Sequence, residues 1–95
     1  MPKTAEQFSS ISLKLTPKER EFLLGFLIMG EYLEQRLRAT PSREEHVPFE
    51  AGELLDLYGW LNAPGNQSGD ERIQRQLDLI CERARRLIPE DLFED

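Results

Sequence analysis

Hydrophobic residues recur with the period of an α-helix across residues 16–37. The start of this segment carries a capping box, in which Thr16 and Glu19 can satisfy each other's free backbone amides, and Pro17 takes the first helical position. One stripe has the spacing i, i+4, i+7, i+11 and i+15, and consists of Phe22, Phe26, Met29, Leu33 and Leu37. This pattern predicts one amphipathic helix whose stripe faces a core.

The same predicted helix is apolar on a second side, where Leu24, Leu27 and Ile28 lie. Either the other helices of the chain cover these three residues, or they form a self-complementary interface between two copies. We expect a homodimer, because short chains often bury surplus apolar surface in that way. Gly25 and Gly30 weaken the helix, so we expect close packing at Gly25 and a bend at Gly30.

Two short segments have the composition of β-strands. Residues 11–15 alternate between apolar and polar side chains, and residues 46–49 form the other strand-like stretch, although Pro48 limits its pairing. A single strand would leave its backbone groups unpaired. We therefore predict a minor two-stranded antiparallel pairing of about 11–15 with 46–49.

Two further helices follow. The second covers about residues 50–62, and its buried stripe is Leu54, Leu57, Tyr58 and Leu61. Residues 62–69 are rich in turn-forming residues and predict a flexible loop. The third helix begins at a capping pair, Ser68 and Glu71, and ends near Ile88 because Pro89 stops it. Its core stripe consists of Ile73, Leu77, Ile80, Ala84, Leu87 and Ile88.

These elements predict a mainly α fold, a three-helix bundle with the minor strand pairing. The chain has 95 residues, enough for a single core, and we place one helical domain at residues 11–89. Residues 1–10 are expected to form a flexible N-terminal arm. Residues 90–95 form an acidic tail with four carboxylates around Leu92 and Phe93.

The charge of the chain narrows its binding partners. A formal net charge of −6 disfavours general binding to nucleic acids or anionic membranes. The apolar run of residues 22–29 is far shorter than the roughly 20 residues that span a bilayer, and the N-terminus lacks the pattern of a secretory signal. Cys81 is the single cysteine, which suits a reducing compartment. We therefore expect a soluble cytoplasmic protein.

An arginine-rich face lies opposite the core stripe of the third helix. It consists of Arg72, Arg75, Leu79, Arg83 and Arg86, at i, i+3, i+7, i+11 and i+14. Such a face can bind an acidic protein, a phosphate backbone or the acidic tail of a neighbouring subunit. Alternatively it is a solvated surface on which Asp78 and Glu82 balance part of the charge.

The residues that usually carry out catalysis are scarce. His46 is the single histidine and lies close to Pro48 in the linker between the first and second predicted helices, while Cys81 lies at the edge of the core stripe of the third helix. One histidine and one cysteine cannot form a transition-metal site, and no calcium-loop or phosphate-loop pattern occurs. We predict no catalytic, metal or cofactor site.

The function predicted from these observations is that of a non-catalytic interaction or regulatory protein that works as a homodimer. The alternative is a DNA-binding regulator that uses the arginine face of the third helix. Against that alternative, the connection at 62–69 is longer than the turn of a helix-turn-helix motif, and the net charge has the wrong sign.

Overall fold

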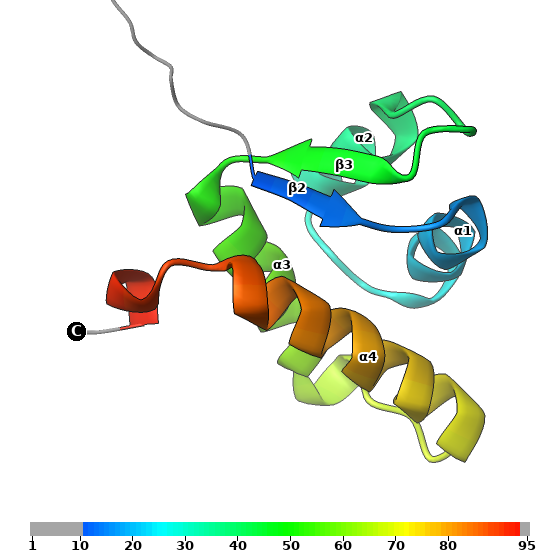
Figure 1. Cartoon of the computed structure of the whole chain (residues 1–95). Coiled ribbons are helices and arrows are strands. Elements are labelled where there is room, and N and C mark those ends of the chain that lie inside the picture. Colours follow the sequence, from blue (N-terminus) through cyan, green and yellow to red (C-terminus); the bar gives the residue numbers. More distant parts are fainter. Residues whose placement is uncertain (1–10, 94–95) are drawn as a thin grey trace, which may run out of the picture.

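A computed structural model of the chain describes residues 11–93 (Figure 1). Its elements, in chain order, are β2 (Ile11–Lys14), α1 (Pro17–Phe26), α2 (Glu31–Ala39), β3 (His46–Phe49), α3 (Ala51–Asn62), the 3-10 turn η1 (Pro64–Asn66), α4 (Glu71–Leu87) and the 3-10 turn η2 (Glu90–Phe93). The fold is mainly helical with a two-stranded antiparallel sheet, as predicted. The prediction of three helices is wrong, because the described residues form four α-helices.

The extra helix arises because the first predicted helix is divided. Helix α1 ends at Phe26, and the backbone at Leu27 and Gly30 is extended, with ψ angles of 130° and 148°. In this extended segment the side chains alternate: Leu27 and Met29 are buried, whereas Ile28 is exposed. In a continuous helix the side chains of Leu27 and Met29 would point about 200° apart around the helix axis. The break therefore allows both side chains to reach the core.

Neither glycine has the role that a single helix implied. A Cβ atom added at Gly25 would meet no neighbouring atom within 4 Å, so the prediction of close packing there is wrong. Gly30 is the N-cap of α2, and the chain is broken at this position rather than bent. Both glycines lower helix propensity close to the division, which favours the break.

The N-terminus of α1 is the capping box that the sequence predicts. The Thr16 amide donates to Oε1 of Glu19 at 2.9 Å, and the Glu19 amide donates to Oγ1 of Thr16 at 3.1 Å. Pro17 occupies the first turn, where its missing N–H costs nothing. This cap ties the end of β2 closely to the start of α1.

The predicted strand pairing is also confirmed. In the antiparallel register, Leu13 lies opposite Val47 and Ser12 lies opposite Pro48. Leu13 and Val47 are buried and point to the core, while Ser12, Lys14 and Pro48 are exposed on the outer face. Pro48 has no N–H to offer a further strand, so the outer edge of β3 is blunted.

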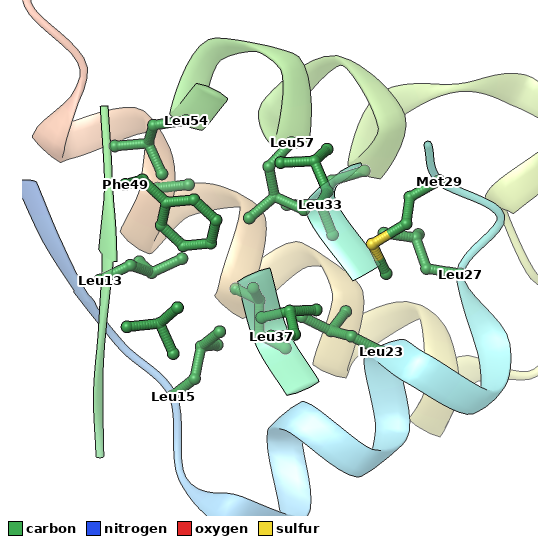
Figure 2. Packing of buried hydrophobic residues seen from close by; sticks show 14 of the residues in the cluster. Leu13, Leu15, Leu23, Leu27, Met29, Leu33, Leu37, Phe49, Leu54 and Leu57 are labelled. Carbon is green, nitrogen blue, oxygen red and sulfur yellow. The ribbon is translucent and has the colours of Figure 1, made fainter. Parts of the chain in front are cut away.

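The core lies between the inner face of the sheet and the helices. Figure 2 shows Leu27 and Met29, from the segment between α1 and α2, pointing into the same cluster as Leu33 and Leu57. From α1 itself, Leu23 is fully buried. The predicted core positions Phe22 and Phe26 are only partly buried, and their rings stack with centroids 5.6 Å apart. The break after Phe26 explains this difference, because the stripe does not continue into α2 on one helix face.

Helices α3 and α4 lie side by side and close the other side of the core (Figure 1). The predicted limits of both helices agree with the structure to within a few residues. The predicted cap of α4 is wrong: Asp70, not Ser68, is the N-cap, and its Oδ1 accepts from the Arg72 amide at 2.9 Å. Leu87, which was predicted to be buried, is 39% exposed.

The chain beyond α4 forms the short turn η2, which extends away from the end of that helix (Figure 1). Leu92 in this turn is 38% exposed. The predicted arm at residues 1–10 and the last two residues of the predicted tail lie outside the described residues.

Candidate functional site

The outward face of α4 presents the arginine-rich set that the sequence predicts. We call Arg72, Arg75, Leu79, Arg83 and Arg86 the α4 surface. Leu77, Ile80 and Ala84 are buried on the opposite side of the helix, which orients the α4 surface away from the core. Leu79 is 54% exposed at the middle of this surface, a high value for a leucine.

Arg83 differs from the other arginines because it holds the fold together. Its Nη1 donates to the Lys14 carbonyl at 2.7 Å and to Oε1 of Glu19 at 2.9 Å, and its Nη2 donates to Oε2 of Glu19 at 3.1 Å. The hydrogen bond from Arg83 lowers the pKa of Glu19, although partial burial of the carboxylate acts in the opposite direction. Arg83 therefore fixes α4 against α1 and β2, and much of its hydrogen-bonding capacity is used within the chain.

The remaining arginines of the α4 surface are less engaged. Arg86 contacts Glu82 at 3.9 Å, and both side chains are well exposed, so this ion pair contributes little to stability. Within residues 11–93, Arg72 and Arg75 form no ion pair. Helix α4 carries five arginines and three carboxylates, a local charge of +2 in a chain whose formal charge is −6.

Leu79 lies between two shallow hollows. The hollow on the sheet side has a volume of about 410 Å³ and is lined by Leu79 and by Ser12, Lys14, His46, Glu82, Arg83, Arg86 and Leu87. The hollow on the α3 side has a volume of about 360 Å³ and is lined by Leu79 and by Tyr58, Arg75, Asp78, Cys81, Glu82 and Arg85. The exposed leucine thus forms a ridge with cationic side chains in both adjoining hollows.

The residues predicted for a dimer interface do not share one exposed face. Leu27 is only 4% exposed and belongs to the core of its own chain, Leu24 is partly buried, and Ile28 is 66% exposed. Their predicted common face required a continuous helix, and α1 ends before Leu27. Self-association stays a prediction, but Leu24, Leu27 and Ile28 do not together form an exposed surface that could mediate it.

A buried asparagine in the predicted flexible loop was missed by sequence reasoning. Asn66, 2% exposed, accepts from the Ile28 amide and donates to the carbonyls of Ile28 and Trp60. The loop composition indicated turns, and no pattern marked one of its polar residues as buried. These bonds connect the segment after α1 to the end of α3.

Arg20 is a second polar residue whose role was missed. This side chain is 5% exposed, and its guanidinium donates to the carbonyls of Thr40, Pro41, Ser42 and Glu44 at 2.7–2.9 Å. One arginine thus holds the whole turn between α2 and β3. In the sequence, Arg20 follows Glu19 in the first turns of the helix, as many surface arginines do. The sequence therefore does not indicate that its side chain is buried and binds the turn.

Glu53 is the third buried polar residue that the sequence pattern did not indicate. It closes the N-terminal cap of α3 by accepting from the Glu50 amide, and it pairs with Arg36 of α2 at 2.6 Å. Burial raises the pKa of Glu53, but hydrogen bonds from Tyr32, the Glu50 amide and Arg36 outweigh it and lower the pKa overall. This pair fixes α2 to α3 at a distance from the α4 surface.

Cys81 and His46 lie in different hollows and have different neighbours. The Cys81 thiol accepts a hydrogen bond from Asn62 at 3.2 Å, and burial together with Asp78 and Glu82 raises its pKa. His46 is exposed on β3, where its Nδ1 is 3.8 Å from Glu44. Among residues 11–93, no group of three or more histidine, cysteine or carboxylate side chains converges as a metal site requires.

No helix of the described chain has the length and apolarity that crossing a bilayer requires. The sequence matches no protein-family model, and neither the curated proteins nor the solved structures that were compared with it gave a match.

Proposed function

We propose that this chain is a non-catalytic interaction protein, which binds an acidic and partly apolar segment of another protein on the α4 surface. The observation that carries this proposal is the exposure of Leu79 on the same helix face as Arg72, Arg75 and Arg86, of which only Arg86 has an ion pair within residues 11–93, a long and exposed one with Glu82. Burial of Leu79 by a partner would stabilise the complex, since full burial of a leucine side chain contributes about 1.5–3 kcal/mol.

The charges around Leu79 specify the chemistry of the partner. Arginine side chains bind carboxylates in a planar, two-point geometry, so Arg72, Arg75 and Arg86 favour a segment that carries glutamate or aspartate. The rest of the chain is strongly acidic and repels such a segment elsewhere. The partner is therefore guided to α4, while the leucine ridge selects segments that also carry an apolar side chain.

The same arrangement favours a protein partner over DNA. A DNA phosphate backbone that extended beyond α4 would be repelled by the net charge of −6, and Arg83 already donates three hydrogen bonds to Lys14 and Glu19. DNA binding by α4 remains the alternative function and is included in the test. We further propose a cytoplasmic location, where the protonated thiol of Cys81 stays reduced.

A fluorescence-anisotropy titration tests the proposal with three labelled probes: a short peptide of glutamate and leucine, its lysine and leucine counterpart, and a DNA duplex. Of the three probes, the wild-type protein should bind only the acidic peptide, and its affinity for that peptide should fall as salt is added. An Arg72→Glu, Arg75→Glu double variant should lose this binding. Both positions are exposed, and glutamate near the N-terminus of α4 suits the helix dipole, so this variant should fold.

An Arg38→Glu, Arg43→Glu double variant is the matched control, because it makes the same change of charge at exposed positions outside α4. It should bind the acidic peptide nearly as tightly as the wild type. Binding to DNA that is lost in the α4 variant would overturn the protein-partner proposal in favour of the alternative. Equal loss in both variants would show that only net charge matters, and would also contradict it.

A further inference from the structure

We propose that the C-terminal segment of one copy of the chain, residues 90–95, binds the α4 surface of a second copy. This inference rests on the proposed function and names one occupant of the same surface. It would make the chain a self-associating protein whose tail competes with an external acidic partner.

The segment has the chemistry that the α4 surface should select. Its sequence, Glu-Asp-Leu-Phe-Glu-Asp, places four carboxylates around two large apolar side chains. The charges complement the arginines, and an apolar side chain can cover Leu79. Leu92 is 38% exposed on η2, so it is available for such a contact.

A contact within the chain already pairs α4 with this segment. Arg85, near the end of α4, lies 3.4 Å from a carboxylate oxygen of Glu90. The pair shows that arginines of this helix and carboxylates of the tail are compatible neighbours. Asp91 and Leu92 follow Glu90 in η2 and are exposed, and η2 extends away from the end of α4 in Figure 1.

The direction of η2 favours binding in trans. Arg72 lies 16 residues before Ile88 in sequence, which corresponds to about 24 Å along a helix. The four residues of η2 rise about 2 Å each, so this turn spans roughly 8 Å and does not reach Arg72 of its own chain. It extends away from the end of α4 rather than back along it (Figure 1).

The arginines also explain why the tail is needed in a dimer. If two α4 helices packed in antiparallel fashion with Leu79 at the centre, Arg72 of one copy would approach Arg86 of the other. Such contacts between like charges oppose association. Carboxylates of the tail, placed between the arginines, convert the repulsion into attraction.

Sedimentation equilibrium of the full chain over a range of concentrations tests this inference. The wild type should self-associate reversibly and more weakly at high salt. A tail-neutral variant, with Glu90→Gln, Asp91→Asn, Glu94→Gln and Asp95→Asn, should raise the dissociation constant by about tenfold or more, given four exposed charge contacts. The Arg72→Glu, Arg75→Glu variant should do the same, and the Arg38→Glu, Arg43→Glu control should not.

A charge exchange gives the most specific result. A variant whose four tail acids are replaced by lysine should self-associate poorly, and so should the Arg72→Glu, Arg75→Glu variant. An equal mixture of the two should form a heterodimer, because lysines of one tail meet glutamates on the other α4 surface. Absence of the heterodimer would overturn the inference.

A wild type that is monomeric at every concentration, or that associates as tightly with a neutral tail, would also overturn it. These results are separable from a failure of the proposed function. If the chain is monomeric but still binds the glutamate and leucine peptide, self-association is wrong and the partner surface stands. If the peptide does not bind either, both proposals are wrong.

Discussion

Asn66 pairs with Ile28 as a neighbouring strand would, since its Oδ1 accepts from the Ile28 amide at 2.8 Å and its Nδ2 donates to the Ile28 carbonyl at 2.9 Å. The same Nδ2 donates to the carbonyl of Trp60 at 2.9 Å. Ile28, in the extended segment between α1 and α2, therefore has both of its backbone groups hydrogen-bonded without a sheet. The division of the first predicted helix and the connection between α3 and α4 are stabilised by one side chain.

Replacement of this asparagine should be costly. Asn66→Ala removes three hydrogen bonds and leaves the partly buried backbone groups of Ile28 unpaired, so we expect the free energy of unfolding to fall by about 2–3 kcal/mol. Urea denaturation measures this change. Asn62→Ala is the control of the same residue type, since Asn62 is exposed, and it should cost less than about 0.5 kcal/mol. Equal losses in the two variants would contradict the role given to Asn66.

Arg20 provides a second test of a buried polar residue. Arg20→Met keeps much of the aliphatic stem but removes the hydrogen bonds to the carbonyls of Thr40, Pro41, Ser42 and Glu44, and we expect a loss of roughly 2–4 kcal/mol in the free energy of unfolding. Arg20→Lys should recover only part of it, because one ammonium group cannot span the same set of acceptors. Lys18→Met, at an exposed position of the same helix, should be nearly neutral in thermal denaturation. If Arg20→Lys is as stable as the wild type, the several hydrogen bonds from the guanidinium do not account for the stabilising role of Arg20.

The pairing of Glu19 with Arg83 should appear in the pH dependence of stability. The pKa of Glu19 is lowered in the folded state from its ordinary value of 4.5, mainly by Arg83, so its contribution is fully present above pH 4.5. That contribution is lost as the pH falls through the lowered pKa. The difference in unfolding free energy between the wild type and Glu19→Gln should therefore shrink on acidification.

Urea denaturation of the wild type and Glu19→Gln, at a series of pH values from neutral downwards, measures this difference in unfolding free energy. Glu21→Gln, at an exposed position in the same helix, is the control and should track the wild type across the range. A constant difference between the wild type and Glu19→Gln would contradict the assignment.

Leu27 and Ile28 are neighbours in sequence and should respond in opposite ways to truncation. Leu27→Ala removes a core side chain, with an expected loss of about 2–4 kcal/mol, whereas Ile28→Ala should change stability by less than about 0.5 kcal/mol. Chemical denaturation of the two variants measures both values. Similar losses would indicate that the two residues lie on one helix face, as the sequence pattern suggested, and not in an extended segment.

Several parts of the fold could be predicted from the sequence because each has a local cause. The cap at Thr16, the pairing of β2 with β3 and the extent of α3 follow from turn residues, alternation and helical period. The apolar run of residues 22–29 was misinterpreted because it fits a helix and an extended segment equally well. Asn66 decides between them, and it lies 38 residues away from Ile28.

The candidate site was predictable to a similar degree. The helical period alone placed Arg72, Arg75, Leu79 and Arg86 on the outer face of α4, and these residues are exposed. The role of Arg83 could not be foreseen, because its partners Lys14 and Glu19 come from distant segments and meet it only in the packed structure. A stripe on a helix therefore identifies a surface, but it does not show which of its residues already form contacts within the chain.

Amide chemical shifts in nitrogen-15 spectra test the central proposal most directly, because they show where a partner binds. On titration with the glutamate and leucine peptide, the account predicts shifts concentrated on the α4 surface, and their loss in the Arg72→Glu, Arg75→Glu variant. Shifts centred on Ile28 and Trp60 instead, or no shifts at any residue, would contradict it.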